Sequence, residues 1–410
     1  MILVRIKKRC LGDVIFLSAL LCVAAGAVQA QSYRTVVIFG DTQTAVNGGP
    51  TQYADFTEQI DWVVANKYTE NIDFVLHVGD IIDTGTFLPL PSACVGAPPP
   101  SSSCSSQGNP CWSPPPGCFS AADGSGGSVC LSCAGIRNAV DVQWSNFNAQ
   151  WSRLEPNAGT GWQGIPYAIV RGNHDNIGVS VPNDVDTVGF NQYYSESQME
   201  SLEAAFDGND RVYEHLESYE SSVEGNGNAW RFSLGGRPVV IVGPSYEGGG
   251  DISEAQIDWV IDVFGDHPNA NGMLLVHDAQ QYGQIYHDIV LNMETVAPNL
   301  ILAAQGHIRH DEKTIQTISG YPVIRTISDW SRTSSPGGSY FAVLRFYFEA
   351  GEDDEVEAFS YSPVLDSVSS NPNATIVKQP FPVPVPEPSV WALRVSGLLG
   401  LLSLGRCGRD

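Results

Sequence analysis

The stretch DFVLHVGDIID, residues 73–83, carries the clearest structural signal in the chain. An almost uninterrupted apolar run leads to Gly79, and the chain then turns polar at Asp80, with a second carboxylate at Asp83. Continuous apolarity over so short a length is typical of a strand covered on both faces. Because ligands of open α/β sheets bind beyond the carboxyl ends of the strands, this stretch predicts a strand that delivers carboxylates to a site.

The same apolar pattern recurs along the chain and predicts an α/β core. The further strand candidates are 35–40, 165–171, 238–243, 272–277 and 299–305. Helices are expected at 55–67 and at 253–264, where Ser253 and Gln256 form a capping-box pattern. Three strand-rich segments follow, at 321–328, 340–348 and 355–361. The layout is therefore α/β first, with a β-rich continuation.

Polar side chains stand at or just after the ends of five predicted strands. They are Asp41, Asp80, Asn173 with His174, His277 and His307. Each one alone is better explained as a turn or capping residue, since Asp and Asn are common after strands. As an ordered set they indicate a metal centre, and the mixture of carboxylate and imidazole suits Zn, Mn or Fe better than Mg or Ca.

This ordered set resembles the signature of the calcineurin-like metallophosphoesterases, which runs D-x-H, G-D-x-x-D, G-N-H-[DE], a lone H and G-H-x-H. The chain reads DTQ at 41–43, GDIID at 79–83, GNHD at 172–175, VHD at 276–278 and GHIR at 306–309. The resemblance extends from residue 34 to about residue 330 and implies a four-layer αββα sandwich that hydrolyses phosphoesters with two metal ions. Asp83 argues against the purple acid branch, which has Tyr there.

The resemblance implies a metal ligand at several matching positions. Asp80 matches the carboxylate that bridges the two metals. Asn173, His277 and His307 match the remaining ligands of the second metal, so that site is complete in this sequence. Asp41 matches a ligand of the first metal.

The resemblance also implies a catalytic pair. His174 matches the residue that contacts the phosphate and protonates the leaving group, and Asp83 matches the carboxylate that orients it. The implied reaction is attack on a phosphomonoester or phosphodiester by a metal-activated water.

Two positions depart from the family pattern, because Gln43 and Arg309 stand where the family has His. An amide oxygen is a weaker, neutral ligand, whereas a guanidinium cannot bind a cation but can grip phosphate. We therefore expect a weak or empty first metal site, with Arg309 taking part in neutralising the phosphoryl group. The adjacent His310 would point the other way on an extended chain, so only a local shift would let it replace the missing ligand.

Both ends of the chain resemble processing signals. Residues 1–30 have the basic start, apolar segment and small-residue cleavage site of a signal peptide. Residues 386–410 resemble the PEP-CTERM sorting tail of Gram-negative bacteria, which an exosortase-like membrane protease removes; Arg394 in the apolar segment departs from that pattern. The alternative is a proline-rich linker followed by an ordinary tail helix. We expect export to the periplasm, cell envelope or exterior, with membrane contact only through the tail.

Most of the cysteines are gathered in one Pro-, Ser- and Gly-rich segment, 86–136. They are Cys94, Cys104, Cys111, Cys118, Cys130 and Cys133. In an exported chain this even cluster indicates disulfides of unassigned pairing, with a zinc half-site at CLSC as the alternative. We expect the segment to be an irregular insertion in a phosphoesterase domain spanning 31–362, followed by a linker at 363–385.

The charge balance narrows the possible partners. With 45 acidic and 21 basic side chains, the formal net charge is −24, which disfavours binding to nucleic acid. A small phosphorylated substrate is compatible with it, because a metal centre inverts the local field. We expect an exported phosphoesterase; the alternative is a non-catalytic or weakly active envelope protein that keeps the fold and one metal. His77 is expected in the core, and His215, His267 and His287 on the surface.

Overall fold

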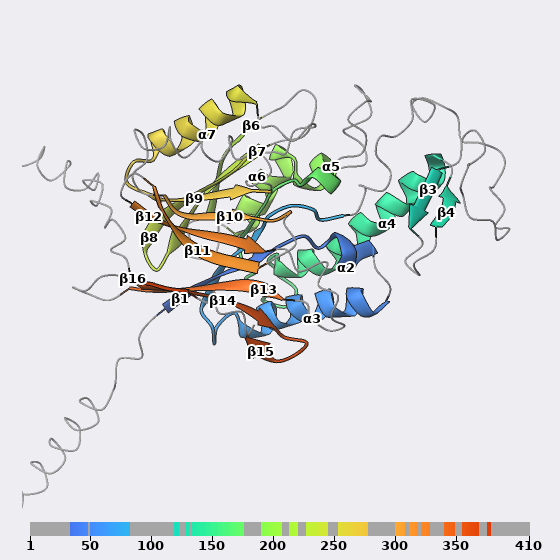
Figure 1. Ribbon diagram of the computed structural model, residues 1–410, viewed down its shortest axis with the longest axis horizontal. Helices are drawn as coiled ribbons and strands as arrows, with labels where there is room; N and C mark the ends of the chain where they lie inside the picture. The colour runs from blue at the N-terminus through green and yellow to red at the C-terminus, as the bar shows by residue number, and fades with distance from the viewer. Residues whose placement is uncertain are drawn as a thin grey trace, which may run out of the picture.

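Two stacked β-sheets form the centre of the molecule in the computed structural model. The structure describes residues 33–47, 50–82, 119–122, 128–131, 133–175, 190–206, 213–219, 227–244, 253–277, 300–307, 311–318, 321–328, 340–348, 355–368 and 375–378. Within these ranges each of the two main sheets has seven strands, and helices cover their outer faces (Figure 1). The architecture is therefore the four-layer αββα sandwich that the sequence predicts.

The first sheet is mixed, with parallel strands where the site lies. Its strands are β1 (Tyr33–Phe39), β2 (Ile72–His77), β5 (Tyr167–Ile169), β13 (Phe341–Tyr347), β14 (Glu355–Ser362), β15 (Ser367–Val368) and β16 (Thr375–Lys378). Their order is β15-β14-β13-β1-β2-β5, with β16 paired to β14. Strand β2 is parallel to both β1 and β5, so the ends of these three strands that bear the predicted site residues meet at one edge.

The second sheet is also mixed, with parallel strands next to the site. Its strands are β6 (Tyr213–Tyr219), β7 (Gly227–Leu234), β8 (Arg237–Gly243), β9 (Asn271–Val276), β10 (Leu300–Gln305), β11 (Asp311–Ile318) and β12 (Tyr321–Ser328). They are ordered β11-β12-β10-β9-β8-β7-β6. Strands β8, β9, β10 and β12 run parallel, and every residue of β9 and β10 is buried, as the continuous apolarity of these runs predicts.

Helices cover the outer faces of both sheets. Helices α3 (Pro50–Asn66) and α4 (Cys133–Trp151) lie along the first sheet and α7 (Glu254–Asp266) along the second (Figure 1). Ser253 caps α7, where its side chain accepts a hydrogen bond from the backbone N–H of Gln256 at 3.3 Å. The shorter helical segments are α2 (Gln43–Asn47), η3 (Ser152–Leu154), η4 (Asn173–Asp175), α5 (Phe190–Tyr194) and α6 (Glu196–Phe206).

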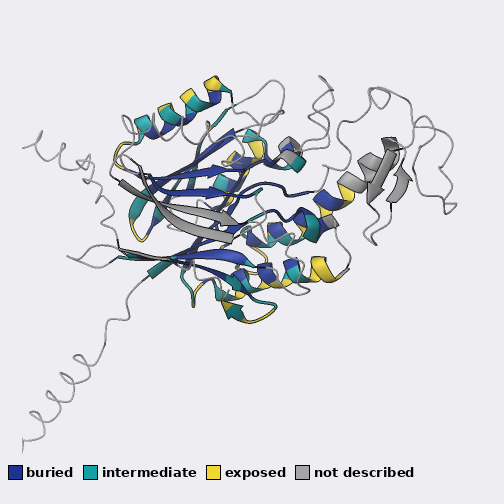
Figure 2. Ribbon diagram, in the orientation of Figure 1, coloured by how far each residue is buried: buried dark blue, intermediate teal, exposed yellow. Residues whose placement is uncertain are grey.

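Aromatic side chains fill the core and join the layers. The rings of Phe74 on β2 and Phe232 on β7 stack across the two sheets at 4.1 Å between centroids. On the outer face of the first sheet, Trp151 of α4 meets Phe39 of β1 edge-on at 5.5 Å. Buried residues accordingly concentrate between the layers (Figure 2). Among the helices that the structure describes, none is long and apolar enough to cross a membrane.

The structure departs from the sequence expectations in three places. A hairpin, β3 (Phe119–Ala122) and β4 (Ser128–Leu131), lies inside the segment expected to be irregular, and α4 begins within it. Strands β15 and β16 lie inside the expected linker, because the β-branched run of β16 and the short β15 both pair with β14. His215, expected on the surface, is buried on β6 against Trp230, with its ring nitrogen 3.2 Å from the Asn228 side chain.

Candidate metal centre

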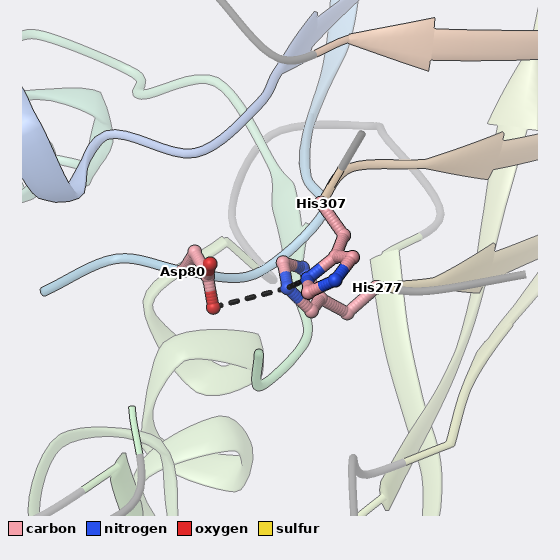
Figure 3. Close-up of side chains that lie close together, drawn as sticks. All are labelled: Asp80, His277 and His307. Carbon is pink, nitrogen blue, oxygen red and sulfur yellow. Dashed lines mark hydrogen bonds and ion pairs between the residues drawn. The ribbon is translucent and has the colours of Figure 1, made fainter. Parts of the chain in front are cut away.

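Three predicted ligands from both sheets come together at one point. Asp80 follows β2, His277 follows β9 and His307 follows β10, and one ligand atom from each lies within 4.8 Å of the others (Figure 3). Nε2 of His277 is 3.0 Å from Oδ1 of Asp80 and 3.2 Å from Nδ1 of His307. Asp80 and His277 are buried, whereas His307 is partly exposed. This set matches three of the four ligands expected for the second metal.

Unusual backbone conformations make this convergence possible. Asp80 and His307 have positive φ angles of 51° and 65°, which L-residues rarely adopt outside special sites. Gly79 has φ 92°, and a Cβ there would lie 2.7 Å from the backbone N of Gly172. A Cβ on Gly172 would lie 2.2 Å from the backbone N of Asp80. The glycines of GDIID and GNHD therefore allow the two loops to approach each other.

His277 is held in the tautomer that a metal ligand requires. Its Nδ1 lies 2.9 Å from the carbonyl oxygen of Val78. Because a carbonyl only accepts, Nδ1 carries a proton and donates it, which directs Nε2 toward Asp80 and His307. A backbone carbonyl on the second ring nitrogen is the usual support of metal-binding histidines.

The charges at the centre are coupled. Burial lowers the pKa of His277, but the adjacent Asp80 carboxylate outweighs it and raises that pKa to about 10. Burial raises the pKa of Asp80, yet His277 holds it below its ordinary value. Without a metal, His277 and Asp80 thus form a buried ion pair, and a cation that binds there must displace a proton.

Gln43 lies directly beside this pair. Its Nε2 donates to Oδ2 of Asp80 at 3.2 Å, and its backbone N donates to the Asp80 carbonyl at 2.9 Å. Its Oε1 is buried and has no hydrogen-bond partner in the described part of the chain. A buried oxygen of this kind demands an explanation, and a bound cation supplies one. The residues present therefore fit a divalent metal ion.

Asp41, which follows β1, supports the cluster through hydrogen bonds to the His307 backbone. Its two carboxylate oxygens accept hydrogen bonds from the backbone N–H of His307 at 3.2 and 3.1 Å, and Oδ1 is 3.9 Å from Nδ1 of His277. The predicted ligand of the first metal thus fixes the loop that carries His307.

The loop after β5 brings His174 to the centre. Its backbone N–H donates to Oδ1 of Asp80 at 2.9 Å, and its Nε2 is 3.9 Å from Oδ2 of Asp80. The imidazole is 16% exposed, so it lies between the buried carboxylate and solvent. A small molecule that approaches the cluster from solvent can therefore reach this imidazole.

Asp175 is the residue that the sequence reasoning missed. Its Oδ1 accepts from the backbone N–H groups of Ile81 and Ile82 at 2.8 and 3.0 Å, and its Oδ2 from Gly172 at 2.8 Å. Burial and the nearby Asp80 raise the pKa of Asp175 to about 7, against the lowering by these backbone donors. The sequence held one signal for this role. Asp175 stands three residues after Gly172 in GNHD, and an Asp side chain in a turn often accepts a hydrogen bond from a nearby backbone N–H.

Four of the candidate site residues considered from the sequence are not placed in full, and His287, expected on the surface, also lies outside the described residues. Asn173 begins η4, and its side chain is outside the description. Asp83, Arg309 and His310 all lie outside the described residues. Their roles remain those expected from the sequence.

Part of the chain is similar to a known protein family. Residues 34–230 match the family model of the calcineurin-like phosphoesterases. A calcineurin-like metallophosphoesterase domain is therefore supported, and with it a hydrolase of a class that uses divalent metal ions. The match includes Asp41, Asp80 and His174 and ends before His277 and His307. The second sheet supplies those two imidazoles, from residues that lie after the matched segment.

Two individual proteins are similar to the chain. The uncharacterized protein YvnB of Bacillus subtilis (strain 168) is 22% identical over 347 residues, which is 82% of this chain and 20% of that protein. The chain thus spans about a fifth of that relative. A solved structure of the sulfate thiohydrolase SoxB from Thermus thermophilus, in complex with glycerol, is 12% identical with a TM-score of 0.31. That similarity covers 91% of this chain and 60% of SoxB.

Proposed function

We propose that the protein is a metal-dependent phosphoesterase that hydrolyses a phosphomonoester or phosphodiester at the Asp80–His277–His307 centre. The observation that carries the proposal is the support of His277, whose Nδ1 is held by the Val78 carbonyl so that Nε2 faces Asp80 and His307. Oε1 of Gln43, which is buried and has no hydrogen-bond partner among the described residues, supports a cation bound beside Asp80. The family match supports a hydrolase of this type.

The proposed ligands are Asp80, His277 and His307, with Asn173 as the fourth, and the ion is Mn, Fe or Zn. A cation held there would polarise the phosphoryl group and acidify a water molecule. Arg309 is proposed to grip the phosphoryl oxygens, in place of a strongly held first metal at Asp41 and Gln43.

His174 is the proposed general acid. Its position beside Asp80, at the boundary between the buried centre and solvent, allows its ring to reach the leaving-group oxygen of a bound ester. An imidazole can give up a proton near neutral pH, and Asp83 is proposed to orient it. A protein that only displayed a metal would have little reason to retain the pair of His174 and Asp83.

Hydrolysis of aryl phosphate mono- and diesters tests the proposal, with the purified protein supplied with Mn²⁺, Fe²⁺ or Zn²⁺ in turn. His174→Ala should lower kcat by about 10²- to 10⁴-fold, the usual contribution of general acid catalysis. His267→Ala is the matched control, because this histidine lies past the end of α7 and should leave kcat unchanged. If the metal-loaded protein hydrolyses neither ester class, the non-catalytic envelope protein becomes the better account.

We also propose that the protein is exported in a Gram-negative bacterium, on the strength of its two terminal segments. The six clustered cysteines are then proposed to form disulfides, and an exosortase-like protease to remove residues 386–410. Mass spectrometry of the protein from the envelope fraction tests this: the mature chain should begin near Gln31 and lack the tail. A full-length chain in the cytoplasm would contradict it.

A further inference from the structure

His77 is a fully buried histidine three residues before Asp80. It ends β2, and its ring packs edge-on against Phe147 at 5.5 Å and Trp151 at 5.3 Å. Packing alone would be served equally well by an apolar ring. A buried imidazole also needs partners for two nitrogens, and the partners found here all lie in the loops of the candidate centre.

The hydrogen bonds of His77 are consistent with only one placement of the proton on its neutral ring. The backbone N–H of Gly79 donates to Nδ1 of His77 at 3.2 Å, so Nδ1 carries no proton. The neutral ring then has its proton on Nε2, which donates to Oγ1 of Thr42 at 3.0 Å. Thr42 in turn donates its hydroxyl proton to the carbonyl of Ile81 at 3.2 Å. Each donor thus has one acceptor.

This chain of bonds joins two of the three loops of the first sheet that carry predicted metal ligands, the loops after β1 and β2. Thr42 lies between Asp41 and Gln43, and Gly79 and Ile81 flank Asp80. Direct backbone bonds between the loops exist as well, such as that from Gln43 N to the Asp80 carbonyl at 2.9 Å. The bonds of His77 differ from these because they start from a side chain that packs on Phe147 and Trp151, and together with Thr42 they reach the residues on both sides of Asp80.

We propose that His77 and Thr42 are positioning residues that hold the loop of Asp80 against the loop of Asp41, whose carboxylate fixes the backbone of His307, and that they thereby set the affinity of the centre for a divalent cation. This inference rests on the proposed function, since it concerns the same centre. Residues that support metal ligands typically change metal affinity by about 10- to 100-fold when they are removed.

The chain offers closely matched variants. Thr42→Val removes the hydroxyl and keeps the shape, whereas Thr42→Ser keeps the hydroxyl. Thr35 provides the control: it is buried at the other end of β1, and its Oγ1 donates to the Glu70 carbonyl at 2.5 Å. Thr35→Val therefore removes the same kind of bond far from the centre. His77→Phe keeps an aromatic ring against Phe147 and Trp151.

Calorimetric titration of the metal-free proteins with Mn²⁺ and with Zn²⁺ tests the proposal, alongside thermal unfolding of each variant. Thr42→Val and His77→Phe should each weaken binding by about 10-fold or more, and the double variant should lose little beyond the larger single loss. Thr42→Ser should restore affinity close to that of the wild type. Thr35→Val should lower thermal stability but bind both ions like the wild type.

The possible outcomes distinguish the positioning role of His77 and Thr42 from the proposed metal centre itself. Wild-type affinity in Thr42→Val, or an equal loss of affinity in Thr35→Val, would overturn the positioning role and leave the metal centre standing. A wild-type protein that binds neither ion would overturn the proposed function and this inference together. If His77→Phe does not fold, the comparison of the Thr42 and Thr35 variants still decides the question.

Discussion

The carboxylates of Asp80 and Asp175 each bind the loop that carries the other. Asp80 accepts a hydrogen bond from the backbone of His174 at 2.9 Å, and Asp175 accepts from Ile81 and Ile82 at 2.8 and 3.0 Å. Asp175 also closes its own turn through Gly172. The GDIID and GNHD segments are thus interlocked, and the position of His174 depends on both carboxylates.

Replacing Asp175 by Asn should loosen this interlock. All three hydrogen bonds to its carboxylate come from backbone N–H groups, on both oxygens, so an amide must turn its NH₂ toward at least one donor. We expect the free energy of unfolding to fall by about 1–3 kcal/mol in urea denaturation, the cost of a buried unsatisfied donor. Asp262→Asn, on the exposed face of α7, should change it by less than about 0.5 kcal/mol. Equal effects of the two substitutions would contradict the interlock.

A methyl group at Gly172 should displace Asp80. The new Cβ would lie 2.2 Å from the Asp80 backbone N and 2.3 Å from its Oδ1, so one of the two loops must move. Gly172→Ala is therefore expected to abolish measurable metal binding in calorimetric titration. Gly159→Ala is the control, because its nearest neighbour is the end of the exposed Asn157 side chain at 3.2 Å. Normal metal affinity in Gly172→Ala would show that the close approach is dispensable.

The stability of the protein should respond to pH through Glu155. Burial raises its pKa, although the Tyr167 hydroxyl donates to its Oε1 at 2.9 Å and lowers it. Because the folded-state pKa is raised, the folded protein binds the proton more tightly than the unfolded chain. The contribution of Glu155 to stability is therefore present at acid pH and is lost as the pH rises through the folded-state pKa.

Glu155→Gln keeps the acceptor for Tyr167 and removes the charge. Its melting temperature should exceed that of the wild type at pH 8, and the difference should shrink toward pH 4. Glu200→Gln, on the exposed face of α6, should show a difference that stays constant over this range. A melting temperature for Glu155→Gln that is below that of the wild type at pH 8 would contradict the buried-charge argument.

The sequence predicted the elements whose apolarity is continuous. Strands β1, β2, β8, β9 and β10 lie within one or two residues of the predicted ranges, because full burial imposes an unbroken apolar run. Strands such as β6, with the sequence YEHLESY, were not predicted, since polar residues alternate along this edge strand. Pairing partners supplied by the sheet, rather than local composition, decide such strands.

The sequence predicted which residue types form the candidate site, but not the backbone conformations and hydrogen bonds that hold them in place. The order of Asp, His and Gly along the chain indicated Asp80, His277 and His307. No local sequence pattern predicts that Asp80 and His307 have positive φ angles, or that Asp175 accepts hydrogen bonds from the loop of Asp80. These features depend on contacts between segments about 90 residues or more apart, such as Ile81 with Asp175 and Asp41 with His307.

Metal analysis by plasma mass spectrometry, after reconstitution with Mn²⁺ or Zn²⁺ and desalting, tests the central claim most directly. The matched pair is Asp80→Asn and Asp73→Asn, because Asp73 is a buried carboxylate on β2, the strand that Asp80 follows, and pairs with Arg34 at 3.4 Å, away from the centre. We predict about one tightly held ion per chain in the wild type and in Asp73→Asn, and none in Asp80→Asn. Two tightly held ions would contradict the weak first site. A metal content that is the same in Asp80→Asn and the wild type would contradict the centre itself.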